Sequence, residues 1–314
     1  MLRRTLIASL ALAAAAWAQQ GPAAVEESGT VFRTDARIVV CHTTVVDKEG
    51  RLVTNLPKDA FSVYEDGVKQ EIKEFKREDI PVSIGLIIDN SGSMRDKRAR
   101  VEAAALALVK ESNPDDEVFI VNFSDEASFD NVGGKAFTSN VREMEQALKR
   151  IDSKGATAMR DALRMAIDHV KSKGRKEKRV LIVVTDGADN ESLITQQSLM
   201  KAAIQSEVLI YSVGLLSEER PAEAEQAKAA LSELSVNTGG EAFFPTELSE
   251  VDRIAHQVAR DIRNQYTIEY TPTNTAMDGT FRKIEVKVDN PDLTVRTRKG
   301  YYASNDAAPA ARKK

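Results

Sequence analysis

Cysteine and aromatic residues are scarce in this sequence. Cys41 is the only cysteine among 314 residues, which excludes an intramolecular disulfide and a metal cage built from several cysteines. Aromatic residues make up 5% of the chain, so a platform on which nucleic-acid bases stack is not expected. Because Cys41 lies in an alternating pattern, we expect it to be a part-buried, inert strand residue rather than a reactive thiol.

The chain also lacks a large excess of one charge sign. Its 44 Lys and Arg residues stand against 48 Asp and Glu residues, so no overall field draws it to nucleic acid or to an anionic membrane. Two basic clusters, at 95–100 and 171–179, are interpreted as solvated helix ends rather than anion sites. With 42% hydrophobic and 29% charged residues, the composition is typical of a soluble globular protein. We expect no nucleic-acid partner.

Signatures of common catalytic sites are missing as well. The three histidines form no Ser-His-Asp order, and the sequence has no nucleophile elbow. We expect packing roles at a strand or on amphipathic helices for His42, His169 and His256. A glycine-rich phosphate loop is not present either. The sequence therefore predicts a protein that is not an enzyme.

The first residues have the layout of a secretory signal peptide. Arg3 and Arg4 precede an apolar run over residues 6–16, and small residues follow at the usual cleavage spacing. The run is shorter than the ~20 residues that a membrane-spanning helix needs, and no cysteine follows it that could carry a lipid. We expect cleavage after Ala18, no stable membrane insertion afterwards, and a periplasmic or secreted mature protein.

Short β-strands are predicted towards both ends of the chain. In the N-terminal group, β-branched runs and the turn at Asp66-Gly67 indicate strands and a hairpin. In the C-terminal group, apolar and polar residues alternate within 266–297. Each group is too small to bury a core by itself. We therefore expect the two groups to pack together as one small β-sandwich.

The middle of the chain alternates between apolar strands and amphipathic helices. Nearly continuous apolar runs at 82–88, 118–123, 180–184 and 208–213 are typical of strands covered on both faces. Helical periodicity fills the segments between them. This alternation predicts an α/β fold with a doubly wound, mainly parallel sheet, inserted between the strands of the small β-sandwich.

These patterns divide the chain into six segments. Their limits follow the changes in periodicity and composition along the sequence. The predicted segments are a signal peptide at 1–18, a linker at 19–30, an N-terminal β-strand segment at 31–79, an α/β domain at 80–262, a C-terminal β segment at 263–303 that pairs with 31–79, and a disordered tail at 304–314.

Polar residues with oxygen-bearing side chains stand beside the predicted strand ends. Asp89, Ser91 and Ser93 follow the first apolar strand, Asp186 follows the strand at 180–184, and Thr157 precedes a helix. Ligands of open parallel sheets bind at the carboxyl ends of the strands, so we expect the three loops to open on one edge. Carboxylates and hydroxyls suit Mg²⁺, Ca²⁺ or Mn²⁺ and suit softer ions poorly. Two negative charges would balance such an ion and leave a position for an outside carboxylate.

The same five residues resemble the metal-ion-dependent adhesion site of von Willebrand factor type A (VWA) domains. All five elements are present, in the order Asp89-x-Ser91-x-Ser93, then Thr157, then Asp186. The resemblance implies that the hydroxyls of Ser91 and Ser93 bind the ion directly. It implies that Thr157 binds directly in one state, and that Asp89 and Asp186 act mostly through water. It further implies a VWA fold and a protein partner that offers an Asp or Glu carboxylate.

The flanking segments resemble a narrower group, the exported bacterial VWFA-related family. The resemblance rests on residues 56–67 (LPKDAFSVYEDG), 279–286 (GTFRKIEV) and 298–302 (RKGYY). It covers nearly all of the predicted mature chain and supports the inserted arrangement of the α/β domain. That family has no well-defined activity, so it adds little about the partner.

Alternative interpretations remain open for the site and for the function. Asp89 and Ser91 could cap the following helix, and Asp186-Gly187 could be a simple turn; capping and metal binding are compatible. The leading hypothesis is an exported protein that mediates divalent-metal-dependent protein–protein interaction or adhesion. The second is a structural envelope scaffold whose β-sandwich makes the contacts. The third, a metal-assisted hydrolase, is the least supported because no general base or second metal site is evident.

Overall fold

The computed structural model describes residues 37–111, 113–149 and 154–304, all of which fall in one compact unit. The predicted signal peptide and linker lie outside the described residues, as does the predicted tail beyond Ser304. In the described ranges, every helix is too short or too polar to cross a membrane.

A six-stranded sheet forms the centre of the α/β part, with the order β10-β9-β8-β5-β6-β7. Four long strands run parallel, and the edge strand β7 is antiparallel to β6. This arrangement confirms the predicted α/β class with a mainly parallel sheet. The strands are β5 (Val82–Asp89), β6 (Glu117–Phe123), β7 (Ala127–Phe129), β8 (Lys178–Thr185), β9 (Leu209–Gly214) and β10 (Ala242–Phe243).

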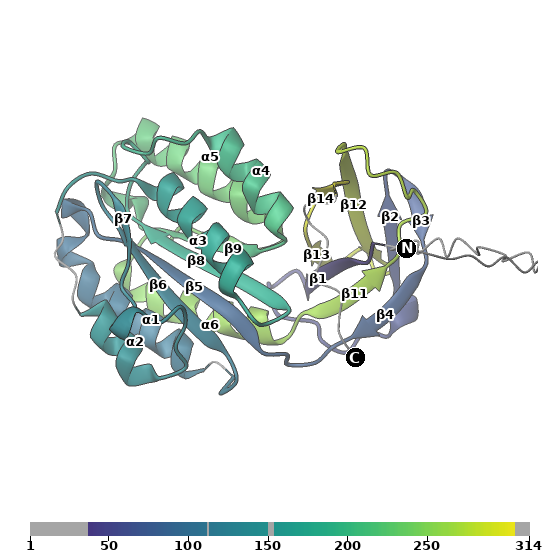
Figure 1. Ribbon diagram of the computed structural model, residues 1–314. Helices are drawn as coiled ribbons and strands as arrows, with labels where there is room; N and C mark the ends of the chain where they lie inside the picture. Colours follow the sequence, from purple (N-terminus) through teal and green to yellow (C-terminus); the bar gives the residue numbers. More distant parts are fainter. Residues whose placement is uncertain (1–36, 112, 150–153, 305–314) are drawn as a thin grey trace, which may run out of the picture. The chain divides into compact units, whose positions relative to one another are not determined.

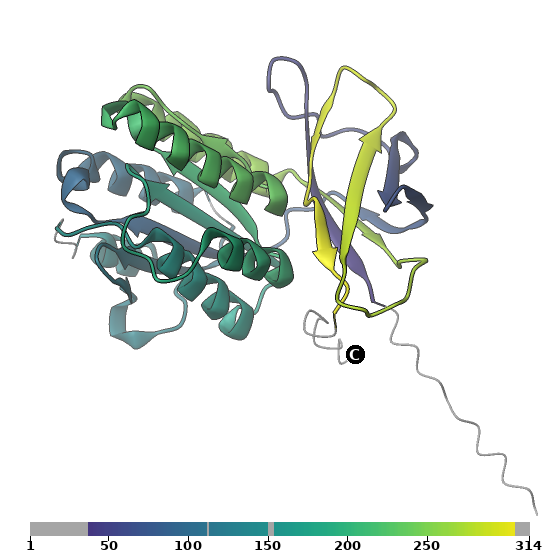
Figure 2. The ribbon, with the colours of Figure 1, turned by 90° about the horizontal axis from the view of Figure 1, so that it is seen from above.

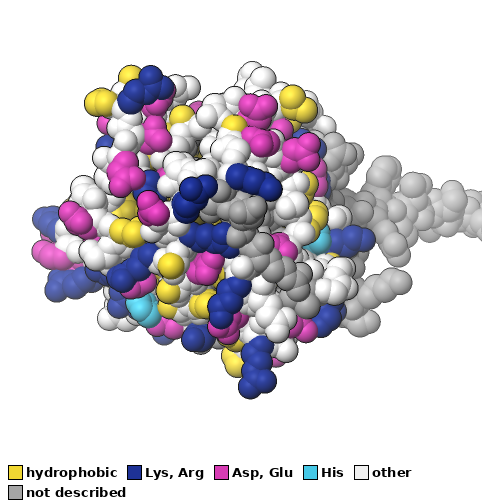
Figure 3. Space-filling model, turned by 90° about the vertical axis from the view of Figure 1, so that its left-hand side faces the viewer, with side chains coloured by type: hydrophobic (Ala, Val, Ile, Leu, Met, Phe, Trp, Pro, Cys, Tyr) yellow, Lys and Arg dark blue, Asp and Glu magenta, His cyan; other side chains and the backbone are white. Residues whose placement is uncertain are grey.

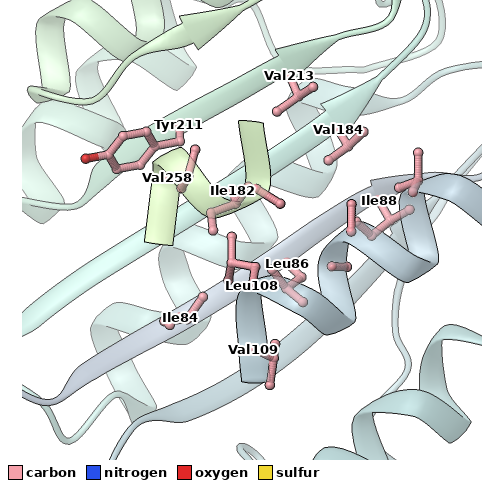
Figure 4. Close-up of a cluster of buried hydrophobic side chains, with 14 of the residues drawn as sticks. Ile84, Leu86, Ile88, Leu108, Val109, Ile182, Val184, Tyr211, Val213 and Val258 are labelled. Atoms are coloured by element: carbon pink, nitrogen blue, oxygen red, sulfur yellow. The ribbon is translucent and has the colours of Figure 1, made fainter. Parts of the chain in front are cut away.

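Helices cover both faces of this sheet (Figure 1). The helices on one face are α1 (Arg98–Lys110), α2 (Val141–Leu148) and α6 (Val251–Arg263). Those on the other are α3 (Met159–Lys173), α4 (Gln196–Ser206) and α5 (Pro221–Thr238). Because side chains alternate along a strand, β5 supplies both layers and every one of its residues is buried. Figure 4 shows one layer, in which Leu86 of β5 lies near Leu108 of α1.

The close approach of three strands explains one glycine of β5. A Cβ atom at Gly85 would lie 2.5 Å from a ring carbon of Phe119 and 2.6 Å from a methyl group of Leu181. Both neighbours belong to adjacent strands and are completely buried. Since real Cβ contacts are never this short, only glycine leaves room for these two side chains at the middle of the sheet.

Strands from the two flanking segments pair with each other (Figure 2). One sheet has the order β13-β1-β11-β4 and the other β14-β12-β2-β3. Side chains of both sheets share a single buried cluster, which includes Cys41, and burial raises the pKa of the Cys41 thiol to about 12. The strands are β1 (Val39–Val46), β2 (Phe61–Glu65), β3 (Val68–Gln70), β4 (Ile72–Lys76), β11 (Tyr266–Tyr270), β12 (Phe281–Val288), β13 (Thr294–Arg296) and β14 (Gly300–Tyr302).

Buried ion pairs link the flanking strands to the α/β part. Arg296 of β13 pairs with Asp261 of α6 at 2.6 Å and also with Glu241. Burial raises the pKa of Asp261 to about 7, and the charges of Arg260 and Lys178 oppose that rise. Since the carboxylate of Asp261 is almost fully inaccessible to water, its charge depends on the guanidinium beside it.

Candidate functional site

The site begins where β5 ends, at Asp89. Both carboxylate oxygens of this residue accept hydrogen bonds: the backbone N–H of Ser91 donates to Oδ1 at 2.8 Å, and the hydroxyl of Thr185 donates to Oδ2 at 2.5 Å. Thr185 is the last residue of β8, which lies beside β5 in the sheet. The carboxyl ends of the two parallel strands are therefore joined through the side chain of Asp89.

A line of hydrogen bonds continues from this carboxylate to Asp186. The hydroxyl oxygens of Ser91 and Ser93 lie 3.1 Å apart, and the hydroxyl of Ser93 donates to Asp186 Oδ1 at 2.9 Å. Asp89 and Asp186 are only 2% and 1% exposed. The structure thus brings four of the five predicted residues together at one edge of the sheet, although their role as metal ligands stays a prediction.

Thr157, the fifth predicted residue, lies in the adjoining loop. The loop is joined to the one after β5 because the N–H of Gly92 donates to the carbonyl of Gly155 at 3.3 Å. Thr157 itself is buried, and its N–H donates to the side-chain oxygen of Asn190 at 3.0 Å. Its carbonyl accepts from the N–H groups of Asn190 and Glu191, so the loop after β8 holds the backbone of Thr157 in place.

Gly155 shapes this loop in a way that no other residue can. Its φ of +84° lies in the left-handed region, and an added Cβ would come within 2.5 Å of the carboxylate of Asp125. That carboxylate accepts a hydrogen bond of 2.6 Å from the N–H of Ala156. The glycine therefore allows the close turn that brings Thr157 to the sheet edge.

Helix capping does not account for these side chains. Ser91 is the N-cap of the short 3-10 helix η2 (Gly92–Asp96), but its hydroxyl makes no capping hydrogen bond. The carboxylate of Asp89 accepts from the N–H two residues on, which is a local turn contact. The capping interpretation therefore leaves both serine hydroxyls unexplained, and Asp89 makes a turn contact rather than a helix cap.

Burial of the carboxyl groups of Asp89 and Asp186 side by side disfavours their charged forms. Burial raises the pKa of Asp89 to about 6, the nearby charge of Asp186 adds to the rise, and hydrogen bonds from Thr185 and Ser91 oppose it. A cation between the two carboxylates would favour their charged forms. The oxygen-only donor set fits a hard divalent ion. Nowhere among the described residues, this site included, do three or more His, Cys, Asp or Glu side chains gather in a group that could hold a metal, so a metal here would depend on hydroxyl oxygens beside the two carboxylates.

Lys97 is a charged neighbour that the sequence patterns did not single out. Its ammonium nitrogen lies 2.8 Å from Asp186 Oδ2 and 2.8 Å from a carboxylate oxygen of Glu218. Lys97 belongs to the basic cluster at 95–100 that was interpreted as a solvated helix end. For Lys97 that interpretation is wrong, because the residue is only 9% exposed. The only sequence signal was its place four residues after the last serine of the motif.

Residues 84–188 match the family model of the von Willebrand factor type A domain. The chain contains a VWA domain. The matched range runs from β5 past Asp186, so it includes all five predicted site residues. The narrower resemblance to the exported bacterial family stays a prediction.

Two protein relatives match part of this chain. Inter-alpha-trypsin inhibitor heavy chain H4 of Bos taurus is 27% identical over 135 residues, which are 39% of this chain and 15% of that protein. An uncharacterized protein of Synechocystis sp. is 31% identical over 115 residues, or 36% of this chain and 26% of its own length. The chain therefore spans only a small part of these relatives.

A solved structure is similar over a longer range. The von Willebrand factor type A protein from Catenulispora acidiphila has a TM-score of 0.51 at 16% identity. The similarity covers 87% of this chain and 65% of that one. At this level of identity it supports the fold of the VWA domain and carries nothing about its ligands.

Proposed function

We propose that the VWA domain binds a protein partner through a divalent ion held at the carboxyl ends of β5 and β8. The proposed ion is Mg²⁺, or Ca²⁺ or Mn²⁺, and an Asp or Glu carboxylate of the partner completes its coordination. The observation that carries this proposal is that Asp89, Ser91, Ser93 and Asp186 gather at one edge of the sheet. The N–H of Ser91 donates to Asp89, the hydroxyls of Ser91 and Ser93 lie 3.1 Å apart, and that of Ser93 donates to Asp186. Such a set of hard ligands is suited to these ions.

The residues of the site have separate tasks in this proposal. Ser91 and Ser93 offer hydroxyl oxygens to the ion, as the resemblance to the adhesion site implies. Thr185 and the backbone of Ser91 hold the Asp89 carboxylate in a fixed orientation. The bound ion supplies positive charge that attracts an external carboxylate. Because protein ligands supply only part of the shell, the strength of partner binding depends on that incoming group.

The surface charge of the α/β part is mixed, which is compatible with a partner that is recognised through a local ion and not through overall charge. In Figure 3, Lys and Arg side chains are interspersed with Asp and Glu side chains on the visible face. A mixed surface of this kind gives little long-range steering. We further propose that the protein is exported to the periplasm or outside the cell, on the strength of the signal-peptide pattern in the sequence.

A pull-down from the native cell envelope tests the proposal. With Mg²⁺ present, the full mature chain should capture a partner; with EDTA, or with Ser91→Ala, that capture should be lost. The matched control is Ser172→Ala, which removes an exposed hydroxyl on α3 that donates only to helix carbonyls. If the partner is still captured in the presence of EDTA and by Ser91→Ala, the proposal is wrong. That result would favour a structural scaffold whose contacts are made by the β-sandwich.

A further inference from the structure

A lysine ammonium already lies against the carboxylate that is proposed to face the ion. Lys97 contacts Asp186 through Oδ2, while Oδ1 of the same carboxylate accepts the hydroxyl of Ser93. Both oxygens of Asp186 are therefore engaged, one of them by a full positive charge. An ion that approaches Asp186 has to compete with that charge.

The position of Lys97 is not explained by the helix to which it belongs. Lys97 is both the C-cap of η2 and the N-cap of α1, so the two helix ends give opposite preferences for a positive charge there. Its backbone is fixed, since its N–H donates to the carbonyl of Met94 at 3.0 Å and the side chain of Met94 is buried. From this fixed backbone the side chain of Lys97 extends to the carboxylates of Asp186 and Glu218, and its ion pairs with them account for its position.

Glu218 is the second carboxylate partner of the same ammonium group. It ends the short 3-10 helix η4 (Leu216–Glu218), which follows β9, and its side chain is 74% exposed. The loop before η4 is fixed to the site because the N–H of Leu215 donates to the carbonyl of Thr185 at 2.8 Å. Lys97 therefore has two carboxylate partners, one buried inside the site and one at its margin.

The charges of these groups define a competition. Asp89 and Asp186 bring two negative charges, and Lys97 cancels one of them within hydrogen-bond distance. A divalent ion at Asp186 would repel the ammonium group at short range. Glu218 offers a place at the margin of the site to which that group can shift while it keeps an ion pair.

We propose that Lys97 is an internal competitor of the divalent ion at Asp186, and that Glu218 takes over its ammonium group when the ion binds. The pair then sets the affinity of the site for the ion. This inference rests on the proposed metal site.

The test measures Mn²⁺ affinity by isothermal titration calorimetry and by electron paramagnetic resonance on the full mature chain. Lys97→Met removes the competitor, so Mn²⁺ should bind roughly tenfold more tightly, as expected for loss of a repelling charge a few ångströms away. Glu218→Gln leaves Lys97 with Asp186 alone, so Mn²⁺ should bind several-fold more weakly. In the double variant Lys97→Met/Glu218→Gln, the change in Mn²⁺ affinity caused by Glu218→Gln should be no larger than the change caused by the control Glu191→Gln.

Two controls separate direct competition from a general change in charge. Arg95→Met removes a positive charge from η2, and Glu191→Gln removes a negative charge from the loop after β8. Both should change Mn²⁺ affinity much less than the paired variants do. Circular dichroism checks that each variant is folded; should Lys97→Met fail to fold, the weaker binding of Glu218→Gln still tests the competition.

The outcomes distinguish this inference from the proposed function. If the wild type binds Mn²⁺ and Lys97→Met does not exceed the Arg95→Met control, the competition is overturned and the metal site stands. If neither the wild type nor Lys97→Met binds Mn²⁺, both proposals fail. Binding by Lys97→Met alone supports the competition in its strongest form.

Discussion

Thr185 has a large influence on the site although it was not among its predicted ligands. Its hydroxyl donates to Asp89, and its backbone carbonyl accepts from the loop before η4. The residue is completely buried at the end of β8. It therefore orients a carboxylate that is proposed to face the ion, and it does so from a neighbouring strand.

Thr185→Val tests this orienting role. The substitution keeps the shape of the side chain but leaves Asp89 Oδ2 buried without its donor, so the free energy of unfolding should fall by about 1–3 kcal/mol. Urea denaturation followed by circular dichroism measures the loss. Thr185→Ser, which retains a hydroxyl, should recover most of it. A Thr185→Val variant as stable as the wild type would contradict the role.

The elements of the α/β part depend on close packing between strands. β5 lies between β6 and β8 and contributes side chains to both faces of the sheet. Gly85 stands at the point where Phe119 and Leu181 approach the strand most closely. The sheet therefore tolerates little change in volume at that position.

Gly85→Ala is expected to destabilise the α/β part. The added methyl group must displace Phe119 or Leu181, and overpacking of this kind costs about 1–3 kcal/mol of unfolding free energy. Thermal unfolding by calorimetry measures the change. Phe119→Leu in the same background makes room, so the loss in the double variant should be smaller than the sum of the two single losses. Additive losses would contradict the proposed clash.

The apolar strands were predictable because burial on both faces leaves a continuous apolar run, and this signal also gave the α/β class. Asp89 and Asp186 were recognisable because each directly follows such a run. The edge strand β7 was missed, since three residues carry no periodicity. Thr185 and Lys97 could not be assigned because their partners are about 90 residues away in the sequence, and only the fold brings them together.

Across the whole molecule, charged side chains join segments that are distant in the sequence. Arg296 pairs with Asp261, and Arg263 at the end of α6 pairs with Asp79 and Asp116. Lys178 donates to the backbone carbonyl of Ile262, and burial lowers the pKa of Lys178 to about 7. These contacts connect the α/β part to the residues that enter and leave it.

Arg296→Met should destabilise the protein in a pH-dependent way. At pH 8 the variant leaves the carboxyl of Asp261 buried without its partner; since its pKa is about 7 even with Arg296 present, protonation limits the charge-linked fall in the free energy of unfolding to about 1–2 kcal/mol. Burial already raises the pKa of Asp261, and loss of Arg296 raises it further. As pH falls below that pKa, the carboxyl binds a proton in the folded state, and the difference from the wild type should shrink.

Urea denaturation at pH 8 and at pH 5.5 measures this difference. Asp261→Asn combined with Arg296→Met removes the unpaired charge, so the double variant should vary less with pH than Arg296→Met does. A difference between wild type and Arg296→Met that is equal at both pH values would contradict the assigned cause.

The course of β5 has a mechanical consequence. Its first residue, Val82, follows the strand segment that contains β4, and its last residue is Asp89 in the site. A force applied through the proposed ion at this end of β5 would therefore act along the axis of a central strand that is hydrogen-bonded on both sides. Such a force loads the hydrogen bonds to β6 and to β8 together rather than one after another. β5 is therefore most resistant to tension that is directed along its own axis.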